Sequence, residues 1–409
     1  MTSNDESGRI GGHTRWFLLG VATVAQVVVA IIRLGIPALM PFIRQDLGLD
    51  RTQVGFISSV LNGGAAAAGI PAGIAVDRFG ERLVLGYGAI GSGLVVLGVS
   101  AGSSFAALLP ILLVTGFLTT TSVPAGGKVV ARWFRDTERG TTMGIRQMGV
   151  PLGGAIAAIA LPPLALATSW QISLSVAGVL AILVGIAALC VYKEPPEATH
   201  GEEQGRRTGV KALLARNDIR AVLAFVFLFG AGQWCYLTYL TLYLTEAINM
   251  SVVVAGTLLA VGQLCGTLGR VGWGLASDRL FRGRRRPVLL IIGALAVITT
   301  LGISMMSTDT PFFVITGIVA VLGLSLQGWN GLTHTLASEL AGAKVAGVAV
   351  GMTNSVGFLG VMFLPPVFGA VVDWTDSYRA AWLVLAMLLF AASCMLFGIG
   401  EPSRRDAGG

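Results

Sequence analysis

Long apolar segments recur along the whole chain, and this recurrence most constrains the fold. A helix that crosses the hydrocarbon core of a bilayer needs about 20 apolar residues. Only 12% of the 409 residues are charged and 54% are hydrophobic, whereas a soluble domain carries about 25% charged residues. Twelve predicted spans lie near 16–43, 53–75, 83–102, 105–129, 141–166, 170–192, 220–246, 252–275, 287–306, 311–336, 345–371 and 379–399.

These segments predict an all-α integral membrane protein with twelve transmembrane helices. A β-barrel would show alternating segments of about ten residues, and the sequence has none. The first run is longer than the core of a cleaved signal peptide, which is about 7–15 residues, so we interpret it as a retained helix. The four cysteines fall inside predicted spans without metal-ligand spacing, and we expect neither a metal nor a cofactor.

The distribution of basic residues predicts the orientation of the chain. Lys and Arg concentrate on the side of the N-terminus, including the run from Arg279 to Arg286, while the opposite loops hold only Arg44, Arg51 and Arg379. The positive-inside rule therefore predicts a plasma or inner membrane protein with both termini cytoplasmic. The polar segment 193–219 is typical of a linker. The predicted order is a tail at 1–15, a six-helix bundle at 16–192, the linker at 193–219, a second bundle at 220–400 and a tail at 401–409.

The two predicted bundles share short sequence matches in the same order. GIAVDRFGERLVLG at 73–86 aligns with the segment 274–290, which places Asp77 over Asp278, and LPPL at 161–164 aligns with LPPV at 364–367. The offsets of five such matches lie between 201 and 208 residues. Parallel repeats of six spans, with a binding site between them near the midplane, are the plan of a secondary transporter.

The segment GIAVDRFGER at 73–82 matches the pattern G-x-x-x-D-R-x-G-x-R. On this loop, and on ARWFRDTERG at 131–140, the chain resembles the major facilitator superfamily over roughly residues 14–400. The resemblance implies that the loop locks an outward-open state, with Asp77 facing helix 11 and Asp278 facing helix 5. The alternative is that these charges only set topology. The predicted gating residues are Gly73, Asp77, Arg78, Arg82, Gly274, Asp278 and Arg279.

Three arginines fall inside predicted spans, although all 21 Asp and Glu residues fall in loops or near helix ends. A charge at the bilayer centre costs ~3 kcal/mol on insertion scales. The three are Arg33, Arg146 and Arg270. Because the planar guanidinium group matches a carboxylate or phosphate bidentately, we infer an anionic substrate.

Each arginine has a second interpretation. Arg33 lies in VVVAIIRLGIPALM at 27–40. Superfamily relatives that carry organic phosphates or carboxylates often bind substrate with an Arg in helix 1, but a packed Arg bonded to neutral groups is the alternative. Arg270 resembles an Arg of monocarboxylate and oxalate carriers, or belongs with Asp278 to a gate through i, i+4 and i+8 spacing. Arg146 is either an anion ligand or inner gate, or its head snorkels to the inner interface.

Neutral and aromatic side chains supply further candidates, each with packing as the alternative. Gln147 and its repeat counterpart Asn354 are possible hydrogen-bond donors to substrate. Tyr236 and Tyr239 recur at helical spacing near Gln233 and Trp234, and His334 is a candidate proton site. The remaining candidates are Trp329 and Asn330 on helix 10, and Asn62 and Gln26.

The combined pattern predicts secondary active transport of a small organic anion, a carboxylate being favoured, by alternating access. The sequence has no G-x-x-x-x-G-K-[ST] nucleotide-binding loop, so transport runs on gradients, by proton symport or by anion exchange; uptake with a proton is favoured. The expected partners are the anion and the lipid bilayer, without nucleic acid, for a monomer that is not an enzyme.

Two alternative functions stay open. GVPLGG at 149–154 is similar to the superfamily's antiporter signature, but with different spacing, which weakens the case for efflux of drugs or hydrophobic metabolites. Such a pump usually has an acidic residue in its cavity. A transporter-like sensor, which binds ligand without turnover, would need a signalling surface that short tails do not provide.

Overall fold

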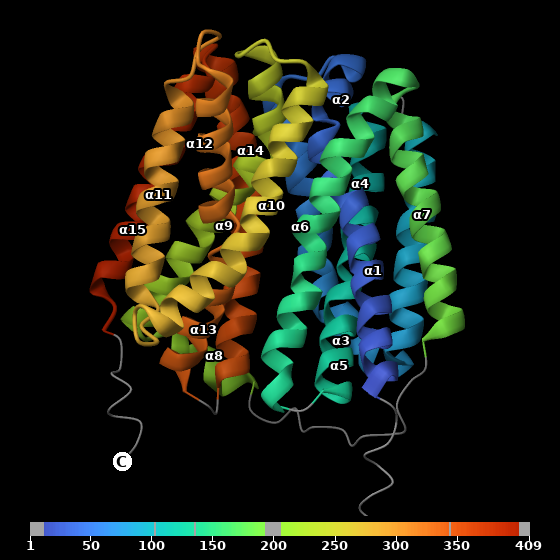
Figure 1. Ribbon diagram of the computed structural model, residues 1–409, viewed down its shortest axis with the longest axis vertical. Coiled ribbons are helices and arrows are strands. Elements are labelled where there is room, and N and C mark those ends of the chain that lie inside the picture. Colours follow the sequence, from blue (N-terminus) through green and yellow to red (C-terminus); the bar gives the residue numbers. More distant parts are fainter. Residues whose placement is uncertain (1–11, 102–103, 135, 193–205, 343–344, 401–409) are drawn as a thin grey trace, which may run out of the picture.

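The computed structural model describes residues 12–101, 104–134, 136–192, 206–342 and 345–400, and these residues form only helices and their connections (Figure 1). Twelve helices in this part of the chain are long and apolar enough to cross a membrane. The all-α class and the predicted twelve spans are confirmed. The end of the bundle at which α1 begins is the one predicted to be cytoplasmic. It is called the inner end below, and the opposite end is called the outer end.

The first half of the chain supplies six spans. α3 holds two of them, because Gly80 takes φ 83, a conformation that favours glycine, and the chain turns back there. The fourth span is broken at Thr121, between α4 and α5. The elements are α1 (Gly12–Ala38), α2 (Met40–Leu47), α3 (Arg51–Leu97), η1 (Gly98–Ala101), α4 (Phe105–Thr120), α5 (Ser122–Trp133), α6 (Asp136–Ala167) and α7 (Trp170–Val191).

The second half repeats this order. Its fourth span is broken too, because α12 ends at Leu326 and α13 begins at Asn330. Of the predicted linker, residues 193–205 lie outside the described part, and a short helix, α8 (Arg206–Leu214), precedes the seventh span. The other elements are α9 (Asn217–Glu246), α10 (Val252–Arg279), α11 (Arg286–Ser304), α12 (Phe312–Leu326), α13 (Asn330–Ala341), α14 (Ala346–Thr375), α15 (Tyr378–Met395) and η2 (Leu396–Gly398).

Small residues let the two halves approach closely. A Cβ atom at Gly55 of α3 would lie 2.4 Å from the carbonyl oxygen of Pro365 on α14. A Cβ atom at Gly154 of α6 would lie 2.5 Å from the side-chain amide nitrogen of Gln263 on α10. Glycine at such positions is the usual means by which membrane helices pack tightly. The halves therefore meet along α3–α14 and α6–α10, and Figure 1 shows their ribbons closer at the outer end than at the inner end.

Candidate functional site

Arg33 lies where the two halves meet. Its Nη2 donates a hydrogen bond of 2.5 Å to Oδ1 of Asn62, on α3 of the same half. Its guanidinium carbon lies 5.1 Å from the ring centre of Trp234 on α9 and 5.9 Å from that of Phe358 on α14, both in the other half. Its buried Nε forms no hydrogen bond with the described residues. The cation is therefore held by one neutral amide and two aromatic faces, and it keeps unused donors.

The partner of Arg33 belongs to a polar chain that crosses between the halves. Nδ2 of Asn62 donates to the carbonyl oxygen of Ser58 at 2.8 Å. The Ser58 hydroxyl lies 2.7 Å from the hydroxyl of Thr238 on α9. Asn62, Ser58 and Thr238 are fully buried, so this chain fixes the orientation of the amide that receives Arg33. The site thus contains groups from α1 and α3 of the first half and from α9 and α14 of the second.

Arg146 lies inside the first half and is almost fully buried, with 1% of its surface exposed. Its Nη2 donates to Oε1 of Gln26 at 3.1 Å and to the carbonyl oxygens of Ser122 and Val123 at 3.0 and 2.8 Å. Those carbonyl groups follow the break between α4 and α5. The guanidinium group does not snorkel to the interface but is held by neutral groups at a broken helix. Gln26 contributes to the same network.

Arg270 occupies a related position in the second half. Its Nε donates to the carbonyl oxygen of Gln327 at 3.1 Å, in the break between α12 and α13. Its Nη1 donates across the halves to the carbonyl oxygen of Gln147 on α6, at 3.1 Å. Gln147 therefore contacts this site through its backbone, while its side chain is exposed. Arg270 has two neutral acceptors, of which one belongs to each half.

The other predicted ligands divide by location. Tyr236 is buried, and its hydroxyl forms no hydrogen bond within the described chain. The Tyr239 hydroxyl lies 2.7 Å from the Arg51 carbonyl oxygen, so it belongs to the outer contact between halves. Trp329 packs in an aromatic cluster and donates to the Leu326 carbonyl oxygen at 2.9 Å. Asn354 is exposed.

Asn330 and His334 lie on α13. Nδ2 of Asn330 donates to Oε1 of Gln233 on α9 at 3.4 Å. Nδ1 of His334 lies 2.9 Å from the hydroxyl of Thr353 on α14. Both contacts stay within the second half. Among the described residues, no group of three or more His, Cys, Asp or Glu side chains is placed to hold a metal ion.

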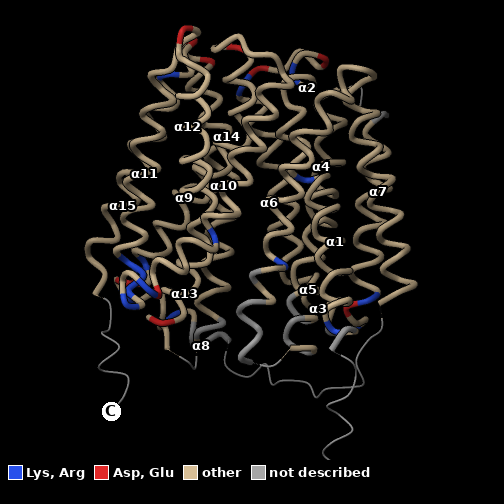
Figure 2. The backbone as a smooth tube through the Cα atoms, viewed as in Figure 1, with Lys and Arg blue, Asp and Glu red and all other residues tan. Residues whose placement is uncertain are grey.

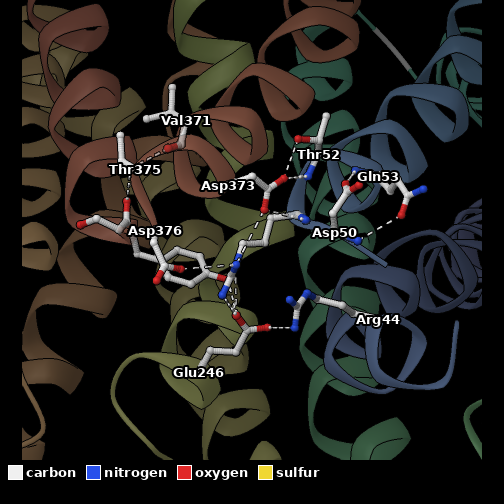
Figure 3. A network of polar contacts seen from close by, with 12 residues as sticks. Arg44, Asp50, Thr52, Gln53, Glu246, Val371, Asp373, Thr375 and Asp376 are labelled. Atoms are coloured by element: carbon white, nitrogen blue, oxygen red, sulfur yellow. Dashed lines mark hydrogen bonds and ion pairs between the residues drawn. The ribbon is translucent and has the colours of Figure 1, made fainter. Parts of the chain in front are cut away.

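A network of charged groups joins the halves at the outer end (Figure 3). Glu246, the last residue of α9, accepts from Nη1 of Arg44 at 2.8 Å and forms an ion pair with Nη2 of Arg51 at 3.1 Å. Asp373 of α14 accepts from the backbone nitrogen of Thr52 at 2.8 Å and from its hydroxyl at 2.6 Å. These contacts close the outer end of the interface between the halves.

Charged residues of the predicted latches contact groups of their own half. Asp278 accepts from Nη1 of Arg285 at 2.5 Å, and Arg82 donates to the carbonyl oxygen of Leu189 at 2.6 Å. Among the described residues, the partner of Asp278 is therefore Arg285, and the contact with helix 5 stays a prediction for the outward-open state. The Asp77 side chain lies outside the described residues. Gly73 and Arg78 lie near the inner turn of α3 at Gly80, and Gly274 and Arg279 lie near the inner end of α10.

Phe358 and the outer network were not predicted from the sequence. Phe358 carries no signal of its own, because one aromatic residue in an apolar helix is usually packing. The outer network does carry a signal: the outer loops of the first half hold Arg44 and Arg51, and the outer helix ends of the second half hold Glu246 and Asp373. Asp46 and Asp50 lie in the same segment of the first half and Arg379 lies in the second, so the charge pattern alone does not select these four residues as partners.

A family model described as Major Facilitator Superfamily matches residues 22–365. The chain belongs to the major facilitator superfamily. This transporter is also similar in fold to a solved bacterial homologue of the human lysosomal transporter Spinster, in an inward-facing and unoccupied conformation. The TM-score is 0.79 at 15% identity, over 95% of this chain and 97% of that one.

Two curated relatives align with this superfamily member over nearly the whole length of both proteins. A probable sulfoacetate transporter of Cupriavidus necator is 28% identical over 396 residues, which cover 92% of this chain and 91% of the relative. A hexuronate transporter of Bacillus subtilis is 25% identical over 390 residues, which cover 90% of this chain and 91% of the relative. Both relatives are named as transporters of organic acids.

Proposed function

We propose that this transporter carries a small organic anion, with a carboxylate or sulfonate group, across the cell membrane by alternating access. One observation carries the proposal: Arg33 lies between the halves, holds only neutral partners and keeps an unpaired donor. An acid group fits the free edge of the guanidinium bidentately. The relatives named for sulfoacetate and hexuronate support this substrate class.

Arg270 is the proposed second ligand. Its bonds to Gln147 and Gln327 are both to carbonyl oxygens, and an anion is a stronger partner for a guanidinium group than a carbonyl is. Substrate binding there would replace the bond to Gln147, which joins the halves. The same exchange is less accessible to Arg146, because its donors are enclosed within one half. Five further residues complete the proposed site, either as contacts of the substrate or as support for the side chains that contact it: Tyr236, Tyr239, Asn330, Trp329 and Asn354.

The moving bodies are the two bundles at 16–192 and 220–400, joined by the linker at 193–219, with both termini cytoplasmic. One chain supplies both halves of the site, so a monomer suffices. The coupling is proton symport through the substrate or His334, or exchange of one anion for another. Vesicles tested with a proton gradient alone and with internal anion alone distinguish these two schemes.

The decisive experiment is uptake of radiolabelled hexuronate and sulfoacetate into proteoliposomes. Arg33→Lys keeps the charge but loses the planar pair of donors, and Arg270→Lys does the same on the other half. Both are expected to reduce uptake at low substrate concentration about tenfold or more, whereas the outer-loop variant Arg379→Gln, whose arginine is exposed, keeps it. If Arg33→Lys and Arg270→Lys both transport like the unchanged protein, the anion-site proposal fails.

A further inference from the structure

The connection between α10 and α11 has two classes of arginine. Arg285 is buried and bonded to Ser277, Asp278 and Glu339. Arg286 donates to the backbone carbonyl oxygens at the end of the last span. Arg279, Arg282 and Arg284 are exposed, and within the described part of the chain their guanidinium groups form no hydrogen bond or ion pair. Figure 2 shows basic residues gathered at this inner end of the second half.

The loop geometry keeps these three guanidinium groups outside the protein. Arg282 takes φ 55 and Gly283 takes φ 80, so two successive residues adopt a left-handed conformation. Such a turn is tight, and it carries Arg282 and Arg284 away from the buried Arg285. Leu280, with 76% of its surface exposed, lies beside them. The loop therefore presents three free cations next to an exposed apolar side chain.

An apolar stripe on α10 leads to this loop. Leu264, Leu268, Val271 and Leu275 are exposed by 44–68% and follow one another at intervals of four, three and four residues, so they share one face of the helix. At 100° per residue the centre of this face lies about 130° from Arg270, which faces the other half. The stripe therefore faces lipid. Arg279 follows Leu275 by four residues and continues the same face to the inner end.

We propose that Arg279, Arg282 and Arg284 bind the headgroup of an acidic phospholipid in the leaflet at the inner end, with its acyl chains along the stripe of α10. Clustered basic residues directly beyond a transmembrane helix are the arrangement that attracts anionic lipids. The apolar stripe selects a lipid over a soluble phosphate, because only a lipid supplies chains at that depth. The site is separate from the proposed anion site and does not depend on it.

The competing explanation is that these arginines only set the orientation of the chain in the membrane. That explanation places a different requirement on the basic residues. Orientation requires a count of Lys and Arg near the span ends, and any set of three at the inner end then serves equally. A headgroup site requires the particular three that are unpaired and adjoin the stripe. Lys211, Arg216 and Arg220, near the start of α9, are three exposed basic residues at the same end, and they supply a matched control.

The test is native mass spectrometry of the full-length protein titrated with phosphatidylglycerol and with phosphatidylcholine. The unchanged protein is expected to bind one phosphatidylglycerol selectively. The triple variant Arg279→Gln, Arg282→Gln and Arg284→Gln is expected to bind it roughly 100-fold more weakly, since each basic residue near an anionic lipid changes affinity about fivefold. The triple Lys variant at the same positions keeps the charges and is expected to keep most of the binding. Comparison of the two triple variants therefore distinguishes loss of the lipid contact from loss of folding.

Three outcomes would overturn the proposal. The first is equal binding of the two lipids by the unchanged protein. The second is an equal loss of binding in the control variant Lys211→Gln, Arg216→Gln and Arg220→Gln, which would indicate a general effect of charge. The third is displacement of the lipid by glycerol phosphate at equal concentration, which would indicate a site for soluble anions.

Discussion

Removing the charge of Glu246 is predicted to shift the transporter toward a state that is open at the outer end. Glu246 receives Arg44 and Arg51 from the other half, at 2.8 and 3.1 Å, and Tyr378 from its own half at 2.9 Å. Only the two arginine contacts break when the halves separate, so only they bias the conformational equilibrium. The variant Glu246→Gln keeps the shape and an acceptor oxygen but removes the charge.

The size of the effect follows from the exposure of the network. The Arg44, Arg51 and Glu246 side chains are 22–27% exposed, so each pair lies between an exposed ion pair, worth about 0–1 kcal/mol, and a hydrogen bond to a buried charged group, worth about 1.5–3 kcal/mol. Taking about 1 kcal/mol for each pair, the substitution removes about 2 kcal/mol from the closed state. The ratio of closed to open molecules then falls about 30-fold.

Spin labels on the outer loops measure this ratio. Thr168 of the first half and Thr308 of the second are exposed, and both accept a label as Thr168→Cys and Thr308→Cys after the native cysteines are replaced. Electron–electron distance distributions should show a longer component that grows in Glu246→Gln. The control Asp309→Asn removes an exposed outer carboxylate of the same half that forms no hydrogen bond or ion pair with the described residues. Identical distributions for Glu246→Gln and the unchanged protein would refute the reasoning.

Three other substitutions probe the remaining contacts. Arg33→Lys should raise the KM for anion uptake about tenfold or more, through loss of the bidentate geometry, with an unchanged Tm; an unchanged KM contradicts the role of Arg33 as ligand. Arg146→Met leaves buried carbonyl groups unpaired and should lower the free energy of unfolding by about 2–3 kcal/mol, measured by thermal unfolding, while KM stays constant. An unchanged stability with a raised KM would instead make Arg146 a ligand. Gly55→Val places side-chain atoms against the Pro365 carbonyl oxygen, 2.4 Å from a Cβ, and should enlarge the long-distance component of the spin-label experiment without any change of charge.

The spans could be predicted from the sequence because the bilayer imposes one simple requirement on each. About 20 apolar residues must occur together, and that pattern is local. The break between α12 and α13 was not predicted, because Gln327 and Gly328 look like ordinary polar and small residues in a helix. The gating loop was recognised from a contiguous motif, but the partner of Asp278 depends on which end of the protein is open, and a sequence does not encode one conformation alone.

The candidate site was harder to predict because its groups come together from distant positions. The absence of acidic residues from the middle of the predicted spans directed attention to the arginines, whose role as ligands stays a prediction. It did not separate Arg33 from Arg146, since both sit in apolar helices with polar neighbours. Only the packing shows that Arg146 has its acceptors within one half, and that Asn62, Trp234 and Phe358 meet Arg33 from three helices. Such convergence has no signature in residue spacing.

The two broken spans account for the burial of two of the three intramembrane arginines. A helix break provides backbone carbonyl groups whose dipoles favour a cation, and Arg146 and Arg270 each bond to carbonyl oxygens at one break. Arg33 has no such support: α1 is continuous around it, and it is received by one amide and two aromatic faces. The energetic cost of burying its charge is therefore the least compensated of the three. In the proposed mechanism, an anion that enters between the halves gains most at Arg33, so we expect substrate binding, rather than folding, to neutralise this residue.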